Sequence, residues 1–214
     1  MMTMPVETQQ PAVRPGAESR AKPDLSEVDF GEAPYLVIWE VTRACDLACR
    51  HCRAEAVPHR DPRELSTLEA MRMMNEVRRF GRPLFVMSGG DPLKRSDTVD
   101  LVEHGARLGL RMGLTPSGTP LMTPEVLRRL QGAGLARLAV SLDGSSAAIH
   151  DAFRGVDGSF DWTVRMLATA REIGLSTQVN TTVTRYNLAD FDRLCDFMTE
   201  LGISLWSVFF LVPT

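Results

Sequence analysis

The stretch Cys45-Asp-Leu-Ala-Cys49-Arg-His-Cys52 places three cysteines within eight residues, at spacings of four and three. It follows an apolar segment, residues 35–41, that we expect to form a β-strand. Thiolates gathered on one polar loop are typical of a metal centre, and iron–sulfur clusters are held mainly by cysteine. Because a fourth local cysteine is missing, a [4Fe–4S] cluster bound here would keep one iron open, as catalytic metal sites do.

Other uses of these cysteines fit the sequence less well. A zinc ion could take the three thiolates with His51 or His59 as fourth ligand, but zinc sites usually combine two ligand pairs and no second pair exists. Disulfides are disfavoured because three clustered cysteines cannot all pair. The remaining cysteine, Cys195, lies between Leu194 and Met198 on the apolar side of an expected helix, and we interpret it as a core residue.

The composition excludes several classes of partner. The hydrophobic content of 44% and charged content of 24% are ordinary for a globular protein, and a net charge of −3 gives no reason to expect nucleic acid or an anionic membrane surface. No apolar run reaches the roughly 18 residues of a membrane-spanning helix. The N-terminus lacks the apolar core of a signal peptide, so reduced cysteines predict a cytoplasmic protein.

The 214 residues are enough for one sizeable core. Residues 1–32 contain several prolines and no hydrophobic periodicity, and we expect a disordered or loosely ordered arm. Residues 33–214 are expected to form a single domain.

Within that domain the sequence repeats one theme, in which a helix ends near a glycine and a strand follows. Ser66-Thr-Leu-Glu69 predicts a capping box, Thr123-Pro124 predicts a helix start, and Asn187 is expected to cap the last helix. The expected strands cover residues 35–41, 84–88, 110–115, 137–142, 175–183 and 203–211. Six mostly apolar strands alternating with five helices predict a parallel α/β protein. Periodicity does not separate an open sheet from a barrel, but both bind ligands at the carboxyl ends of the strands.

Two polar motifs follow expected strands. Ser88-Gly89-Gly90-Asp91-Pro92 would let the backbone approach a ligand closely, with Asp91 available to an ammonium group, although the same residues suit a simple turn. Ser141 and Asp143 alternate with Leu142 and so share one face of the strand, where they suit a ribose or an amino-acid moiety. Alternatively, Asp143 caps the next helix.

Three weaker candidates lie nearby. Asn180 is in an expected strand, where asparagine is depleted, so it is either a ligand contact or a structural residue. Arg154 could meet a ligand carboxylate or pair with Asp151 on the surface. Thr115-Pro-Ser117-Gly118 ends the third strand and is most simply a turn.

Taken together, these motifs resemble those of the radical S-adenosylmethionine (radical SAM) enzymes. The Cys-x3-Cys-x2-Cys run is similar to their cluster signature, Gly89-Gly-Asp-Pro92 resembles their Gly-Gly-Glu-Pro motif, and Ser141-Leu-Asp-Gly144 resembles their fourth-strand motif. Asp91 is one methylene shorter than the usual glutamate. The resemblance covers about residues 34–214 and implies a partial (β/α)6 TIM-like barrel of parallel strands.

The resemblance also implies the cofactors. Cys45, Cys49 and Cys52 would each hold one iron of a [4Fe–4S] cluster, and S-adenosyl-L-methionine (SAM) would bind the fourth iron. The implied SAM contacts are His51 near the adenine, Gly89, Gly90 and Asp91 at the methionine amino group, Ser141 and Asp143 at the ribose or methionine end, and Asn180 closing the pocket.

The activity implied by the resemblance is reductive cleavage of SAM to a 5′-deoxyadenosyl radical that takes hydrogen from a substrate. A low-potential flavodoxin or ferredoxin type protein would supply the electron. The substrate, whether a peptide, a tetrapyrrole or a cofactor precursor, is not identified by the sequence. Alternatives are a non-catalytic metal-binding or sensor module, and an inactive fragment.

Relatives of this kind continue into a C-terminal region with auxiliary clusters, of the SPASM type. Here the sequence reaches Thr214 directly after the sixth expected strand. We therefore expect the domain to be truncated at that point.

Overall fold

The computed structural model describes residues 29–52 and 55–211. The expected N-terminal arm falls almost entirely outside the described residues. A turn at residues 30–32, in which the carbonyl of Asp29 accepts hydrogen bonds from Glu32 and Ala33, leads into the first strand.

Six parallel strands form one sheet whose spatial order is the order of the sequence. The strands are β1 (Leu36–Thr42), β2 (Leu84–Gly89), β3 (Arg111–Leu114), β4 (Leu135–Ser141), β5 (Thr177–Val183) and β6 (Leu205–Phe210). The helices are α1 (Thr67–Arg79), α2 (Thr98–Arg107), α3 (Pro124–Gly132), α4 (Ala147–Arg154), α5 (Ser159–Glu172) and α6 (Phe191–Leu201), with 3-10 turns η2 (Pro92–Lys94) and η3 (Leu188–Asp190). The prediction of a parallel α/β protein is confirmed.

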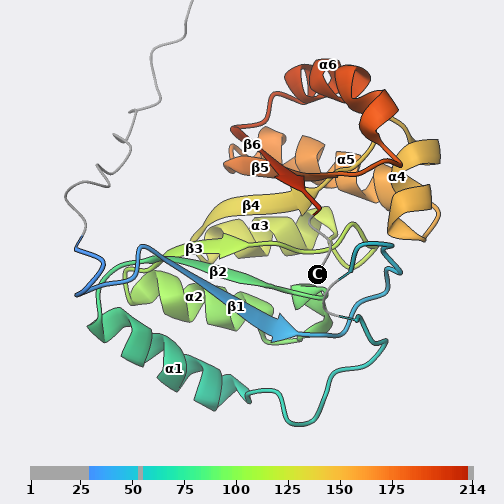
Figure 1. Ribbon diagram of the computed structural model, residues 1–214. Helices are drawn as coiled ribbons and strands as arrows, with labels where there is room; N and C mark the ends of the chain where they lie inside the picture. Colours follow the sequence, from blue (N-terminus) through green and yellow to red (C-terminus); the bar gives the residue numbers. More distant parts are fainter. Residues whose placement is uncertain (1–28, 53–54, 212–214) are drawn as a thin grey trace, which may run out of the picture.

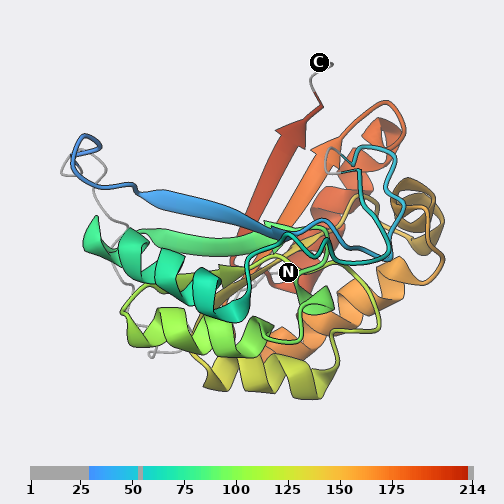
Figure 2. The same cartoon turned by 90° about the horizontal axis from the view of Figure 1, so that it is seen from below.

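The sheet curves into an incomplete barrel (Figure 1). Figure 2 shows α1, α2, α3 and α5 along its convex face, while the concave face stays open between β1 and β6. These two strands are the edges of the sheet in the described part of the chain. This is the partial (β/α)6 barrel that the resemblance implied, and it brings all six carboxyl ends to one rim.

Local sequence explains where the helices begin. The Ser66 hydroxyl accepts a hydrogen bond from the Glu69 amide, and the Glu69 carboxylate accepts one from the Ser66 amide, so the capping box is confirmed. At α3 the Thr123 hydroxyl accepts from the amide of Val126, with Pro124 at the first helical position. Each cap satisfies helix amides that have no partner within the helix.

Two expectations about the helices were wrong. Between β4 and β5 the chain forms two helices, α4 and α5, so the described residues contain six α-helices rather than five. Asn187 does not cap α6, because its side chain instead accepts from the Thr184 amide and donates to the carbonyls of Asp143 and Thr182. These tertiary hydrogen bonds join β5 to the loop after β4.

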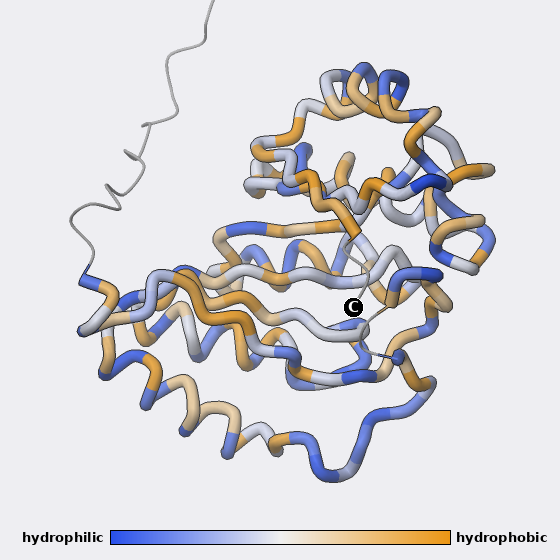
Figure 3. The backbone as a smooth tube through the Cα atoms, viewed as in Figure 1, coloured by the Kyte–Doolittle hydropathy of each residue, from blue (hydrophilic) through white to orange (hydrophobic). Residues whose placement is uncertain are grey.

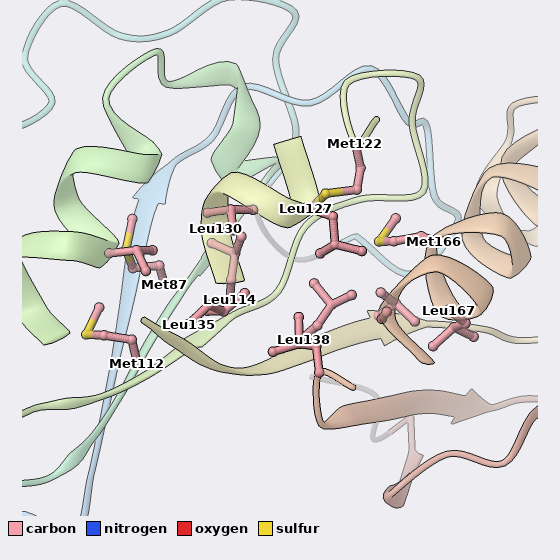
Figure 4. Close-up of a cluster of buried hydrophobic side chains, with 14 of the residues drawn as sticks. Met87, Met112, Leu114, Met122, Leu127, Leu130, Leu135, Leu138, Met166 and Leu167 are labelled. Carbon is pink, nitrogen blue, oxygen red and sulfur yellow. The ribbon is translucent and has the colours of Figure 1, made fainter. Parts of the chain in front are cut away.

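The hydrophobic core lies between the convex face of the sheet and the helices. Figure 4 shows Leu138 of β4 beneath Leu127 of α3 and Met166 of α5, with Met112 of β3 farther along the same cluster. In Figure 3 hydrophobic residues follow the central strands, whereas the loop between β1 and α1 is largely hydrophilic. Cys195 on α6 is only half-buried, so it belongs to the margin of the core rather than to its centre. Among the described residues, the helices are all too short or too polar to cross a membrane.

Candidate metal and cofactor site

One cavity of about 300 Å³ lies at the carboxyl ends of the strands. The loop after β1 contributes to it, together with the ends of β2, β3 and β4 and parts of α4 and α5. Its walls include Glu40, Cys45, Cys49, His51, Cys52, Ser88, Gly89, Gly90, Ser117, Gly118, Ser141, Arg154 and Ser159. All three clustered cysteines therefore face the same space as the glycine motif and Ser141.

Backbone hydrogen bonds hold the cysteine loop at this rim. The Cys45 amide donates to the carbonyl of Val57 over 2.9 Å, and the Cys52 amide donates to the carbonyl of Cys49 over 3.1 Å. The thiols of Cys45 and Cys49 are half-buried and that of Cys52 is exposed. The loop is therefore ordered while its three sulfur atoms stay accessible from the cavity.

The three thiols in one cavity wall are the donor type that holds an iron–sulfur cluster. Among the described residues, no three His, Cys, Asp or Glu side chains form a group that could bind one metal ion. A cubane spreads its thiolate ligands over separate irons, so its three cysteines need not converge on one point. His51 and His59, the fourth ligands considered for zinc, complete no such group among the described residues.

Cys45 also contacts the loop that follows β3. Its sulfur lies 3.2 Å from the Ser117 hydroxyl and accepts from the Leu47 amide at 3.4 Å. Burial raises the pKa of the Cys45 thiol, and the two hydrogen bonds oppose that rise. Coordination to a metal cation would deprotonate the thiol, since a coordinated sulfur binds as thiolate.

His51 presents a flat, uncharged ring to the cavity. The imidazole stacks on Phe153 with ring centroids 4.7 Å apart, and burial together with the nearby Arg154 lowers its pKa. Its Nδ1 atom is buried and has no hydrogen-bond partner in the described part of the chain. A buried polar atom normally has a partner, so this nitrogen is available to a bound group.

The glycine motif requires glycine at two positions. Gly89 has φ +123°, and a Cβ there would lie 2.3 Å from the carbonyl oxygen of Thr42. A Cβ on Gly90 would lie 2.4 Å from the carbonyl oxygen of Ala44. The absence of side chains lets β2 end tightly against the start of the cysteine loop and leaves backbone exposed to the cavity.

Asp91 lies behind the wall of the cavity. Its carboxylate accepts hydrogen bonds from the Thr119 hydroxyl at 2.8 Å and from the amides of Leu93 and Ser117 at 3.1 and 3.4 Å. The side chain is fully buried, and this burial raises its pKa. Asp91 thus ties the loop after β2 to the loop after β3.

Of the two residues on the fourth strand motif, only Ser141 reaches the cavity wall. Asp143 is fully buried and accepts from the guanidinium of Arg154 and from the Thr182 amide, so it does not cap the next helix. Asn180 accepts from the side-chain amide of Gln178 at 2.8 Å and is not part of the wall.

Sequence reasoning left the roles of Ser117 and Arg154 open, and both lie in the cavity wall. Arg154 is buried and pairs with Asp143, while Asp151, its other candidate partner, accepts from the amides of Gly158 and Phe160. Burial disfavours the charged guanidinium, but Asp143 and Cys49 outweigh that effect and raise the pKa of Arg154. The sequence feature that marks Arg154 is the glycine directly after it, Gly155, which ends α4.

His150 supports this arrangement from the core. Its Nδ1 accepts from the Asp143 amide at 3.1 Å and its Nε2 lies 3.3 Å from the Ser159 hydroxyl. Burial and the nearby Arg154 lower its pKa to about 3, so the ring is neutral near pH 7. A neutral His150 fixes the turn that carries Asp143.

Comparison with known proteins identifies the architecture. The family model described as the Radical SAM superfamily matches residues 39–198. The chain is 44% identical over 93% of its length to the AdoMet-dependent heme synthase of Nitratidesulfovibrio vulgaris, covering 54% of that protein. It is 34% identical over 81% of its length to the mycofactocin maturase MftC of Mycobacterium tuberculosis, covering 44% of it. The chain therefore spans about half the length of the curated relatives it matches.

Solved structures agree on the fold. Streptococcus suis SuiB bound to S-adenosylmethionine superposes with a TM-score of 0.75 at 18% identity, over 86% of this chain and 42% of that one. Native anSMEcpe with bound AdoMet superposes with a TM-score of 0.70 at 17% identity, over 83% and 51%.

Proposed function

The chain belongs to the radical SAM superfamily, and we propose that Cys45, Cys49 and Cys52 hold a [4Fe–4S] cluster whose fourth iron binds SAM. When bound, these cofactors supply an electron that splits a C–S bond of SAM and a 5′-deoxyadenosyl radical that abstracts hydrogen from the substrate. The observation that carries the proposal is that three thiols and the glycine motif share one cavity. Cys195 on α6 is not in the wall of that cavity, which leaves one iron to the cosubstrate.

The residues of the wall are assigned to SAM by their chemistry. Gly89 and Gly90 offer backbone groups at close range, Ser141 offers a hydroxyl, and His51 offers a neutral ring beside the adenine. Because the carboxylates of Asp91 and Asp143 already accept from protein donors, we assign both to holding the loops around SAM. We assign Asn180, in the middle of β5, the same supporting role.

A haem-type tetrapyrrole is the substrate class that we propose. Relatives named AdoMet-dependent heme synthase are 41–44% identical to this chain, whereas those named as maturases are about 34% identical. Arg50, beside Cys49, and Arg185, after β5, both stack on Tyr186, with 5.1 and 4.9 Å to the ring centroid. Guanidinium groups bind carboxylates well, and the Tyr186 ring holds two of them together.

Two further features follow from the same chemistry. The cluster needs a low-potential one-electron donor, and we propose a flavodoxin or ferredoxin type protein. The four cysteines of the sequence are free thiols in the structure, so we propose the reducing environment of the cytoplasm as the compartment.

The activity is tested by anaerobic reconstitution with iron and sulfide, followed by dithionite and SAM. We expect a brown protein whose absorbance bleaches on reduction and which forms 5′-deoxyadenosine and methionine. Cys49→Ala should form neither product. A wild-type chain that binds the cluster but leaves SAM intact would instead support a non-catalytic module or an inactive fragment.

The substrate class is tested by adding a tetrapyrrole precursor of haem or an unrelated peptide to the reduced enzyme. We expect the tetrapyrrole alone to raise the rate of 5′-deoxyadenosine formation several-fold. Equal rates with both additions would contradict the assignment.

A further inference from the structure

We propose that Arg154 is a positioning residue for the cluster: its guanidinium, fixed by Asp143, donates to the Cys49 sulfur and raises the reduction potential. The inference rests on the proposed function, because it assumes that Cys49 is an iron ligand. It concerns a residue of α4, which is far from the cysteine loop in sequence, at a separation of 105 residues.

The guanidinium of Arg154 is held between a carboxylate and a thiol. Nη2 donates to Asp143, and Nη1 lies 3.6 Å from the sulfur of Cys49. The Arg154 side chain is 9% exposed and that of Asp143 is 0% exposed, so water does not screen the contacts. Asp143 is itself fixed by the Thr182 amide, which donates to its other oxygen at 2.7 Å. The direction of the Nη1–H group is therefore set by protein contacts on both sides.

Backbone hydrogen bonds keep the thiol within reach of that donor. The amide of Ala48 donates to the carbonyl of Arg154, and the amide of Arg50 donates to the carbonyl of Phe153, both over 3.1 Å. These two bonds flank Cys49 and attach its loop to the end of α4. The stacking of His51 on Phe153 adds a side-chain contact to the same junction.

Gly155 makes the junction possible. It ends α4 in the left-handed region, with φ +72°, and a Cβ there would lie 2.5 Å from the carbonyl oxygen of Ala48. A larger residue would push α4 away from the cysteine loop and lengthen the contact between Arg154 and Cys49. The pair Arg154-Gly155 thus combines a donor with the close approach that the donor needs.

The positive charge of Arg154 is expected to raise the reduction potential of the cluster. Reduction adds an electron to a cluster that is already bound by thiolates, and a hydrogen-bond donor at a coordinating sulfur stabilises the added charge. The low exposure of Arg154 strengthens this interaction, since the local dielectric is lower than that of water. The Asp143 carboxylate offsets part of the arginine charge. The stabilisation of the reduced cluster therefore comes mainly from the hydrogen bond that Nη1 donates to the Cys49 sulfur.

The test is an EPR-monitored redox titration of the reconstituted full chain without SAM. Arg154→Lys keeps the positive charge but loses the two guanidinium nitrogens that reach Asp143 and Cys49 together. The double variant Asp143→Asn/Arg154→Gln removes the ion pair without leaving an unpaired Asp143 carboxylate in the core. Arg165→Gln on α5 is the control, because that arginine is 73% exposed and lies outside the cavity wall. We expect the midpoint potential to fall in the double variant, to fall less in Arg154→Lys and to stay unchanged in Arg165→Gln.

The outcomes separate this inference from the proposed function. A double variant that keeps its iron and the wild-type potential overturns the role of Arg154. Loss of iron from the folded double variant, with normal iron in Arg165→Gln, supports the positioning role. Absence of a cluster from the wild-type chain would instead overturn the proposed function.

Discussion

The amide of Asp91 donates to the carbonyl of Ala44 over 2.7 Å, and so joins the glycine motif to the residue before Cys45. The amide of Gly90 makes a matching hydrogen bond to the carbonyl of Thr42, also over 2.7 Å. Together they make the end of β2 and the start of the cysteine loop one unit. The position of the first thiol is therefore linked to the backbone that lines the cavity.

This linkage makes Gly90 intolerant of a side chain. In Gly90→Ala the new Cβ would lie 2.4 Å from the carbonyl oxygen of Ala44, and that atom belongs to the backbone. We expect a loss of about 1–3 kcal/mol in the free energy of unfolding, as for other overpacked sites. Urea unfolding of the metal-free protein measures it.

Gly132→Ala is the matched control. Gly132 is in α3 and a Cβ there meets nothing within 4 Å, so we expect no loss and a gain of up to about 1 kcal/mol. Equal stabilities of the two variants would mean that β2 and the cysteine loop are not packed as described.

Asn187 should matter for stability although it caps no helix. Asn187→Ala would remove the donor from the buried Asp143 carbonyl and from the partly buried Thr182 carbonyl, and the acceptor from the Thr184 amide. We expect a loss of about 2 kcal/mol in urea unfolding, within the range for buried unpaired polar groups. Asn75→Ala, at an exposed position of α1, should stay within about 0.5 kcal/mol of wild type. A similarly small change for Asn187→Ala would contradict the buried network.

His150 should make the fold sensitive to acid. Its pKa is lowered to about 3 in the folded chain, against 6.5 ordinarily, so below pH 6.5 the unfolded chain binds a proton that the folded chain does not. This group's contribution to stability is therefore complete above pH 6.5 and falls as the pH drops toward 3. Between pH 7 and pH 5 the loss is about 2 kcal/mol, from 1.36 kcal/mol per pKa unit.

The comparison that isolates His150 is the pH dependence of unfolding in wild type and in His150→Gln. The variant is expected to be less stable at pH 7 but to lose less stability on acidification. Asp91, whose pKa is raised by burial, acts in the opposite direction and is present in both proteins. Parallel pH profiles would contradict a buried neutral His150.

The ligand assignment separates the four cysteines. Cys45→Ala and Cys52→Ala should each lose bound iron and acid-labile sulfide, because a cubane that loses one of three protein ligands should not persist. Cys195→Ala should keep the wild-type content, since Cys195 is on α6 and outside the cavity wall. Loss of iron from Cys195→Ala would mean that the ligands are wrongly assigned.

The fold could be predicted in outline because its signals are local. The apolar strands, the Ser66 capping box and the Thr123-Pro124 start depend on neighbouring residues alone. The curvature of the sheet is not encoded in such a pattern, and the barrel followed only from family resemblance. The capping prediction for Asn187 was wrong because its side chain hydrogen-bonds to the carbonyl of Asp143, 44 residues away, instead of to the local helix.

The site was predicted less completely for the same reason. Cys45, Cys49 and Gly90 belong to compact motifs that the sequence displays directly. Ser117 and Arg154 reach the cysteine loop through contacts that span 72 and 105 residues, so the sequence offered both only as weaker candidates beside a structural alternative. Such residues become visible only when the strand ends are brought to one rim.

The most direct test of the central claim is Mössbauer spectroscopy of the chain reconstituted with isotopically enriched iron, recorded with and without SAM. If Cys45, Cys49 and Cys52 are the protein ligands, one iron in four should differ from the rest and change its spectrum when SAM binds. A Mössbauer spectrum that is unchanged by SAM at all four irons, or a preparation that holds zinc in place of iron, would contradict the account.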